Sequence, residues 1–240
     1  MRVAVVTPYF QEGDGVLRQC LDSVAAQAHK VSHILVADGF PKDWAARAAD
    51  NHIVLPGKGH GDNGNLARCV GAMTAVAEGF DAIAFLDADN WYRPDHISSL
   101  LELQRRTGVA LCTAGRSLHR PDGSLLQAND AVSDGVHFAD TSCLLYFRGA
   151  FGLLPLWGLM PRQFSPICDR VMWSAVVARA VPHAHSGLPT MAFRTLYSVH
   201  YQHVGEPPPA NCKNPGPIRE KIELWHQLPE WEKRRIQFGA

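Results

Sequence analysis

Short apolar runs without polar alternation recur through the first half of the chain, at residues 3–6, 34–37, 53–55 and 82–86. Segments with helical periodicity separate them, at residues 16–28, 43–49, 66–78 and 94–106. A strand with no polar face must be covered on both sides, which is typical of parallel sheets joined by helices. The alternation therefore predicts an α/β fold with a mostly parallel sheet flanked by helices.

The second half of the chain, after residue 115, has a different pattern. Its predicted elements are a hairpin turn at residues 121–124, strands at 141–147 and 191–203, helices at 171–180 and 218–227, and a loop at 214–217. They predict a small antiparallel C-terminal part that ends in a helix. Because the sequence has no internal repeat and no long linker, we expect residues 1–240 to form a single domain with halves at 1–115 and 116–240.

Polar side chains follow three of the predicted strands of the first half. Thr7 comes after the first strand, Asp38 after the second, and Asp87 and Asp89 after the fourth. In open α/β sheets ligands bind beyond the carboxyl ends of the strands, so we expect these residues at one ligand-binding edge. The carboxylates of Asp87-Ala88-Asp89 are hard oxygen ligands that suit Mg²⁺ or Mn²⁺, although an Asp-x-Asp can also form an Asx-turn or a helix cap.

Four stretches of the first hundred residues carry a resemblance as a set. They are Val5-Val6-Thr7-Pro8-Tyr9, Ile34-Leu35-Val36-Ala37-Asp38-Gly39, Asn63-Gly64-Asn65-Leu66-Ala67-Arg68 and Phe85-Leu86-Asp87-Ala88-Asp89-Asn90. In this order and spacing they resemble family 2 glycosyltransferases of the GT-A fold. The resemblance implies an enzyme that uses Mn²⁺ or Mg²⁺ to move a sugar from a nucleotide diphosphate-sugar, usually a UDP-sugar, to an acceptor hydroxyl with inversion. Residues 1–115 would then bind the nucleotide-sugar, and residues 116–240 would face the acceptor.

The resemblance also implies roles for individual residues of the first half. A set of them would bind the nucleotide or the sugar: Thr7, Pro8, Tyr9, Asp38, Asp62, Arg68, Asp87 and Ala88. Within this set, Asp38 would accept a hydrogen bond from the base, and Asp87 would contact the ribose or the sugar. Asp89 would ligate the metal ion that bridges the diphosphate.

Fewer positions match in the second half. Asp169 matches the general base of the family, and Cys168 stands where the family usually has Glu. His200 or His203 would complete the metal site, and because a strand would point them to opposite faces we expect one ligand, His200. Asp140 could orient sugar hydroxyls or cap a turn.

Other functions have weaker support in the sequence. Gly59-His60-Gly61-Asp62-Asn63-Gly64 matches the dinucleotide-binding G-x-G-x-x-G of dehydrogenases, but Pro56-Gly57-Lys58 separate it from a very short third strand. A nucleotidyltransferase would need a basic glycine loop after the first strand, where Gln11-Glu12-Gly13-Asp14-Gly15 is acidic. A sugar-nucleotide-binding protein without catalysis stays open, because Cys168 replaces the expected Glu.

The expected partners follow from the same observations. Lys+Arg and Asp+Glu both number 23, so the chain has no net charge with which to hold a nucleic acid. The resemblance implies a nucleotide-sugar donor and a hydroxyl acceptor, which could be a glycan, a lipid-linked sugar or a small molecule. The basic and aromatic residues 231–238 fit either a solvated helix end or contact with a membrane surface. The N-terminus has no signal peptide pattern, so we expect a cytoplasmic protein.

Overall fold

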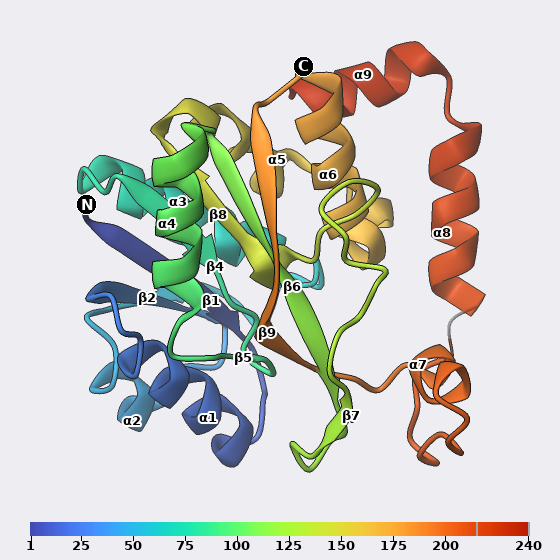
Figure 1. Cartoon of the computed structure of the whole chain (residues 1–240), viewed down its shortest axis with the longest axis horizontal. Helices are drawn as coiled ribbons and strands as arrows, with labels where there is room; N and C mark the ends of the chain where they lie inside the picture. Colours follow the sequence, from blue (N-terminus) through green and yellow to red (C-terminus); the bar gives the residue numbers. More distant parts are fainter. Residues whose placement is uncertain (215, 240) are drawn as a thin grey trace.

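One mixed sheet runs through the molecule in the computed structural model, which describes residues 1–214 and 216–239 (Figure 1). Within those residues nine strands form the sheet, in the order β3-β2-β1-β4-β8-β6-β9-β5, with β7 paired to β6. The strands are β1 (Val3–Tyr9), β2 (Val31–Asp38), β3 (Asn51–Leu55), β4 (Ala82–Phe85), β5 (Trp91–Tyr92), β6 (Leu111–His119), β7 (Leu125–Gln127), β8 (Leu144–Phe147) and β9 (His183–Arg194).

Helices connect and cover these strands. The α-helices are α1 (Asp14–Ala25), α2 (Asp43–Ala46), α3 (Asn65–Ala77), α4 (His96–Thr107), α5 (Leu156–Leu159), α6 (Cys168–Ala178), α7 (Ser198–His203), α8 (Gly216–Gln227) and α9 (Glu230–Phe238). Three 3₁₀ segments, η1 (Thr141–Cys143), η2 (Arg148–Leu153) and η3 (Arg162–Ile167), lie in the second half.

The first four strands of this order, β3, β2, β1 and β4, run parallel and are covered on both faces. On β1, Val3 and Val5 pack with residues of α1 and α4, whereas Ala4 and Val6 pack with residues of α3 and α6. Alternate side chains of one strand thus enter two cores, which explains why the sequence of β1 is apolar throughout. The predicted α/β sheet with flanking helices is confirmed.

Helix α3 lies close against β1 because residue 71 is a glycine. A Cβ atom at that position would lie 2.5 Å from Cγ1 of Val6 and 3.0 Å from Cγ2 of Val36. Interiors are close-packed, so even an alanine would force the helix away from the sheet. The close approach holds the first turn of α3, which carries Arg68, near the carboxyl ends of β1 and β4.

The second half of the chain completes the same sheet. Strand β8 runs antiparallel between β4 and β6, and β9 runs parallel to β6 up to the pair His119↔Arg194. The predicted turn at residues 121–124 is confirmed as the connection of the antiparallel β6 and β7, with Gly123 at φ +88°.

Three predicted elements of the second half differ from the structure. The predicted strand at 191–203 ends at Arg194, where its partner β6 also ends, and the chain turns at Thr195 into helix α7. In the predicted strand at 141–147, the first three residues form η1, because the Asp140 side chain accepts a hydrogen bond from Ser142 N at 2.9 Å. In the predicted loop at 214–217, Pro215 lies outside the described residues and Gly216 already begins α8.

Helices α8 and α9 lie at the edge of the molecule, and α8 stands outermost, on the right-hand side of Figure 1. Residues 231–238, for which a helix end was expected, belong to α9. In the described part of the chain, no helix is long and apolar enough to cross a bilayer.

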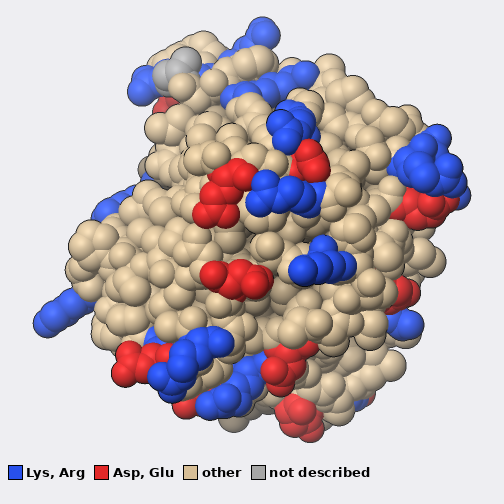
Figure 2. Space-filling model, turned by 90° about the vertical axis from the view of Figure 1, so that its left-hand side faces the viewer, with Lys and Arg blue, Asp and Glu red and all other residues tan. Residues whose placement is uncertain are grey.

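Figure 2 shows one face of the molecule, where acidic and basic side chains are interspersed among wide uncharged areas.

Candidate active site

The carboxyl ends of β1, β2 and β4 lie side by side and border two adjoining hollows. The first, the strand-end hollow, has a volume of about 380 Å³ and is lined by most of the predicted binding residues: Pro8, Tyr9, Asp38, Asp62, Arg68, Asp87, Ala88 and Asp89. The second, the helix-side hollow, has a volume of about 530 Å³ and extends to η3, the start of α6 and the residues after β9. The two hollows share Asn63, Arg68, Asp87 and Asp89.

Thr7 is placed differently from the other predicted residues. Its side chain is completely buried and its Oγ1 lies 2.8 Å from Nε2 of His33. Because its side chain is buried inside the fold, it lines neither hollow. Only the backbone of Thr7 could therefore border a ligand.

Asp38, at the end of β2, is held by the glycine-rich loop before α3. Its Oδ2 accepts a hydrogen bond from His60 N at 3.0 Å, and its Oδ1 lies 2.5 Å from His60 Nδ1. The loop approaches so closely that a Cβ on Gly39, at φ +83°, would lie 2.6 Å from Gly57 O. The G-x-G-x-x-G pattern thus folds over the edge of the sheet, and His60 is a residue that sequence reasoning did not select.

Asp62 and Arg68 fix the start of α3. The Asp62 carboxylate accepts hydrogen bonds from the backbone N–H groups of Gly64, Asn65 and Leu66, at 3.1, 3.1 and 2.9 Å. Arg68 is only 4% exposed, and its Nη2 lies 2.5 Å from Oδ1 of Asp87. Asp62 is therefore a helix cap at the rim of the hollow, whereas Arg68 compensates the charge of Asp87 within it.

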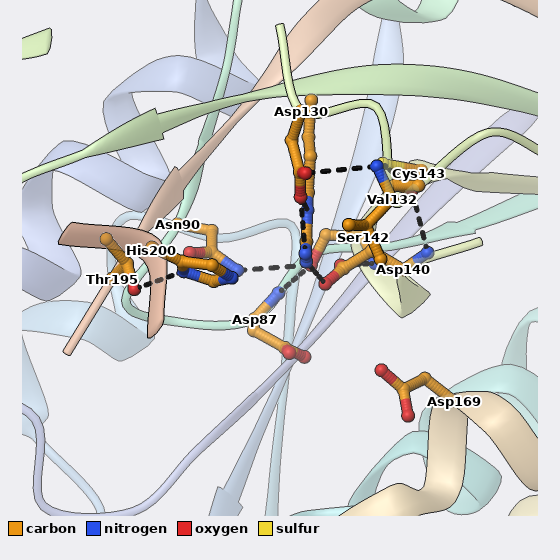
Figure 3. A network of polar contacts seen from close by, with 12 residues as sticks. Asp87, Asn90, Asp130, Val132, Asp140, Ser142, Cys143, Asp169, Thr195 and His200 are labelled. Atoms are coloured by element: carbon orange, nitrogen blue, oxygen red, sulfur yellow. Dashed lines mark hydrogen bonds and ion pairs between the residues drawn. The ribbon is translucent and has the colours of Figure 1, made fainter. Parts of the chain in front are cut away.

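Two other elements, η1 and β9, hold the turn Asp87–Asn90 through hydrogen bonds. Ser142 Oγ of η1 accepts a hydrogen bond from Asp87 N at 3.1 Å (Figure 3). From the end of β9, Arg194 donates its backbone N–H to Asn90 Oδ1 at 3.0 Å and its Nε–H to Asp89 O at 3.1 Å. These contacts satisfy the backbone of the turn and leave the Asp87 and Asp89 carboxylates facing the hollows.

Asp89 is half-buried, and its carboxylate accepts no hydrogen bond from another residue in the described chain. Burial, together with the charge of Asp87, raises the pKa of Asp89 to about 7, and the Lys213 ammonium opposes this shift. An underpartnered carboxylate beside another fits a cation, which would relieve the repulsion. Among residues 1–214 and 216–239, no three His, Cys, Asp or Glu side chains gather as a metal-binding group.

Asp169 lies in the first turn of α6 and reaches the site from the opposite side. Asp87 and Asp169 project toward the same space in Figure 3. Burial raises the pKa of Asp169 to about 6, and the charge of Asp140 adds to the shift. The adjoining Cys168 is buried, which raises the pKa of its thiol to about 12, so Cys168 is un-ionised and cannot replace a carboxylate.

Arg116 of β6 lines the helix-side hollow and forms ion pairs with two buried aspartates. Its Nε donates to Asp130 Oδ2 at 2.7 Å and its Nη1 to Asp140 Oδ2 at 2.6 Å; Figure 3 labels these two aspartates. Because Asp140 in turn holds Ser142, this buried ion-pair network reaches the backbone of Asp87. Asp140 thus caps the turn that begins η1, which is one of the two roles predicted for it. Nothing in the local sequence marks Arg116, since its partners are 14 and 24 residues away.

The predicted histidines lie on α7 and not on a strand, so the expectation that they point to opposite faces is wrong, since residues three apart in a helix are neighbours. His200 lines the helix-side hollow, whereas His203 lines neither hollow. Nδ1 of His200 lies 2.7 Å from Thr195 Oγ1, and burial lowers the pKa of His200 to about 4. The neutral imidazole can therefore act as a ligand only through Nε2.

Lys213 is another residue that sequence reasoning missed. It lines the helix-side hollow, its Nζ lies 5.5 Å from the centre of the Tyr197 ring, and its backbone pairs with Leu196 and Tyr197. The pairing brings a cation close to Asp89 from a segment more than a hundred residues away in sequence. No sequence pattern predicts such a contact.

Comparisons with known proteins agree with this architecture. The pattern of the family described as Glycosyl transferase family 2 matches residues 4–152. A curated relative, the succinoglycan biosynthesis protein ExoW of Rhizobium meliloti (strain 1021), is 33% identical over 112 residues, which cover 44% of this chain and 34% of that protein. The matched part is thus about a third of that relative's length.

Solved structures of S. aureus TarS share the fold. TarS 1–349 in complex with UDP matches with a TM-score of 0.60 at 13% identity, covering 99% of this chain and 70% of that chain. The same fragment with UDP-GlcNAc gives a TM-score of 0.58 at 12% identity, over the same shares of both chains. The family pattern covers more than half of the chain and includes the strand ends that form the strand-end hollow. The chain therefore belongs to glycosyl transferase family 2 and has the GT-A fold.

Proposed function

We propose that this protein moves a sugar from a UDP-sugar to an acceptor hydroxyl, with inversion and with the help of Mn²⁺ or Mg²⁺. The observation that carries the proposal is the meeting of two hollows at Asp87 and Asp89, with Asp169 across the second hollow. A donor in the strand-end hollow would present its sugar at the junction. An acceptor in the helix-side hollow would approach that sugar from the side opposite to the nucleotide.

The donor half of the proposal assigns the strand-end hollow to the nucleotide. Asp38, oriented by His60, would accept a hydrogen bond from the base, between Pro8 and Tyr9 on β1 and the rim around Asp62. Asp87, oriented by Arg68, would contact the ribose or the sugar, next to Ala88. UDP as the nucleotide is supported by the TarS structures, which are complexes with UDP and UDP-GlcNAc.

Asp89 is the residue proposed to hold the metal ion, with His200 as a further ligand. One carboxylate suits Mg²⁺ or Mn²⁺ in an enzyme that binds a diphosphate, because such ions take their other ligands from phosphate and water. A bound ion would stabilise the negative charge of the leaving diphosphate. Lys213, which lies near Asp89, would add positive charge on the same side.

Asp169 is the proposed general base. As the acceptor hydroxyl attacks the anomeric carbon, its proton would pass to a carboxylate oxygen of Asp169, while the bond to the diphosphate oxygen breaks. With a pKa of about 6, Asp169 is mostly ionised near neutral pH and still basic enough to accept a proton. Attack from the face opposite to the leaving group inverts the anomeric centre, and one base is sufficient for this displacement.

Ligand-dependent thermal stability tests the donor and metal assignments. We expect UDP to raise the melting temperature only when Mn²⁺ is present, and GDP, CDP and NAD to have much smaller effects. Ligand at a hundredfold excess over Kd stabilises a protein by about 2.7 kcal/mol, which is readily measured. Asp89→Ala should abolish the Mn²⁺-dependent part, whereas the exposed Asp22→Ala on α1 should leave it intact. Equal stabilisation with and without Mn²⁺ would overturn the metal assignment, and stabilisation by NAD alone would overturn the donor assignment.

A further inference from the structure

A further groove lies between α6, α8 and α9. It has a volume of about 560 Å³. Its accessible apolar lining includes the exposed Val136 and Val177 and the partly buried Ile222, and its basic lining includes Arg170 and Arg234. We call it the α6–α9 groove. None of the residues assigned above to the nucleotide, the metal ion or the base lines it.

The groove continues from the helix-side hollow. Ile167 and Arg170 line both, and Arg170 directly follows Asp169 in α6. On α8, Ile218 lines the hollow and Ile222, one helical turn later, lines the groove. An elongated ligand whose end lies beside Asp169 could therefore extend along α6 and α8 into the groove.

The groove has an excess of positive charge. In residues 1–214 and 216–239, no carboxylate forms an ion pair with Arg170 or Arg234. The acidic residue of the lining, Glu230, is paired with Lys233 at 2.9 Å. The Arg170 guanidinium lies 4.6 Å from the centre of the Phe138 ring, and Arg234 lies 5.8 Å from that of Phe238. These ring contacts hold both cations in place without neutralising them.

We propose that the α6–α9 groove binds an extended acceptor, a sugar chain that carries carboxylate or phosphate groups. Arg170 and Arg234 would pair with its anionic groups, and the aliphatic side chains of Val136, Val177 and Ile222 would pack against the apolar faces of its sugar rings. This inference rests on the proposed function, because it takes Asp169 as the place where the acceptor hydroxyl reacts. It adds the chemical class of the acceptor, which the transferase chemistry alone does not determine.

Binding of fluorescently labelled oligosaccharides, without donor, tests the proposal. The probes are trigalacturonate, phosphorylated maltotriose and neutral maltotriose, and the first two distinguish a carboxylate from a phosphate as the anion. We expect at least one anionic probe to bind about tenfold more tightly than maltotriose, in a salt-dependent manner. Arg234→Gln should weaken that binding about fivefold, as expected for one partly exposed charge pair, and Arg234→Lys should retain most of it.

The matched control is Arg219→Gln on α8. This substitution also removes one positive charge, but Arg219 lines neither the groove nor the helix-side hollow. Equal affinity for neutral and anionic probes, no binding of any anionic probe, or the same loss in Arg219→Gln would overturn the proposal. So would Arg234-dependent binding to phosphatidylglycerol vesicles without binding of the anionic sugars, because the groove would then face a membrane. UDP binding with Mn²⁺, measured in parallel, reports separately on the proposed function.

Discussion

At the scale of single residues, the site concentrates negative charge around one space. Asp87, Asp89 and Asp169 all face the helix-side hollow, and only Asp87 has an arginine partner in the described chain. The pKa of Asp89 rises to about 7 and that of Asp169 to about 6, in each case mainly through burial. A fold tolerates such carboxylates at a cost in stability, which is common where they have a chemical task.

Replacing Asp169 with asparagine should separate catalysis from stability. Loss of the base should lower turnover about a hundredfold or more, with UDP binding retained. The pKa of Asp169 is raised from 3.8 to about 6 on folding, so its contribution to stability is lost as pH rises through this range. At about pH 7.5 the variant should therefore be as stable as the wild type or more stable, and this gain should shrink toward about pH 4.

The pH profile of the wild type is the second measurement for Asp169. Turnover should fall as pH drops through about 6, because the base becomes protonated. Asp22→Asn on α1 is the control, with unchanged activity and profile. If Asp169→Asn keeps wild-type turnover, or loses stability at about pH 7.5, Asp169 is a structural residue and the assignment fails.

The residues that sequence reasoning selected share one property, a position next to a strand end or a helix start. Asp38, Arg68, Asp87 and Asp89 all line the strand-end hollow for that reason. His60, Arg116 and Lys213 were missed, because each comes to the site through tertiary contacts with residues far away in the chain. Such contacts depend on how a loop or a strand folds back, and no local pattern encodes them.

At the scale of elements, the start of α3 links folding to the site. The N-cap position is Gly64, at φ +78°, which provides no side-chain cap, and the Asp62 carboxylate takes over this function with three backbone hydrogen bonds. The same turn carries Arg68 toward Asp87. A less stable first turn would therefore loosen the strand-end hollow as well.

Asp62→Ala should lower the free energy of unfolding by about 1 kcal/mol, the usual cost of a lost helix cap. Urea unfolding measures this loss as a shift of the midpoint. Asp62→Asn should retain part of the stability, because its side-chain oxygen can still accept. The matched control is Asp95→Ala, since Asp95 occupies the N-cap position of α4 without a side-chain cap hydrogen bond. Unchanged stability combined with lost UDP binding would contradict the cap and make Asp62 a ligand-binding residue.

The elements that could be predicted are those whose apolar residues follow one clear pattern, a continuous apolar run for a buried strand or a helical repeat for a helix. The buried parallel strands and helices α1, α3 and α4 satisfy this condition. The segment after residue 190 does not, because its aromatic and β-branched residues favour a strand throughout. What ends β9 at Arg194 is the end of its partner β6 at His119, which is a property of the sheet and not of the segment.

At the scale of the whole molecule, the two halves of the chain share one sheet. Strand β8 of the second half pairs with β4 of the first, and β9 pairs with β5. The helix-side hollow likewise combines Asp87 and Asp89 with Asp169 and Lys213. Neither half can keep its edge of the sheet paired without the other, and the single domain expected from the sequence stays a prediction that an unfolding experiment can test.

We therefore expect one cooperative unfolding transition for the chain. Leu35 and Met172 are completely buried, in the first and second half respectively, and truncation of such a side chain to alanine costs about 2–5 kcal/mol. Leu35→Ala and Met172→Ala should each lower the same single midpoint, whether calorimetry, far-UV circular dichroism or tryptophan fluorescence is used. Two transitions, each lowered by only one of the variants, would show instead that residues 1–115 and 116–240 fold as separate units despite their shared sheet.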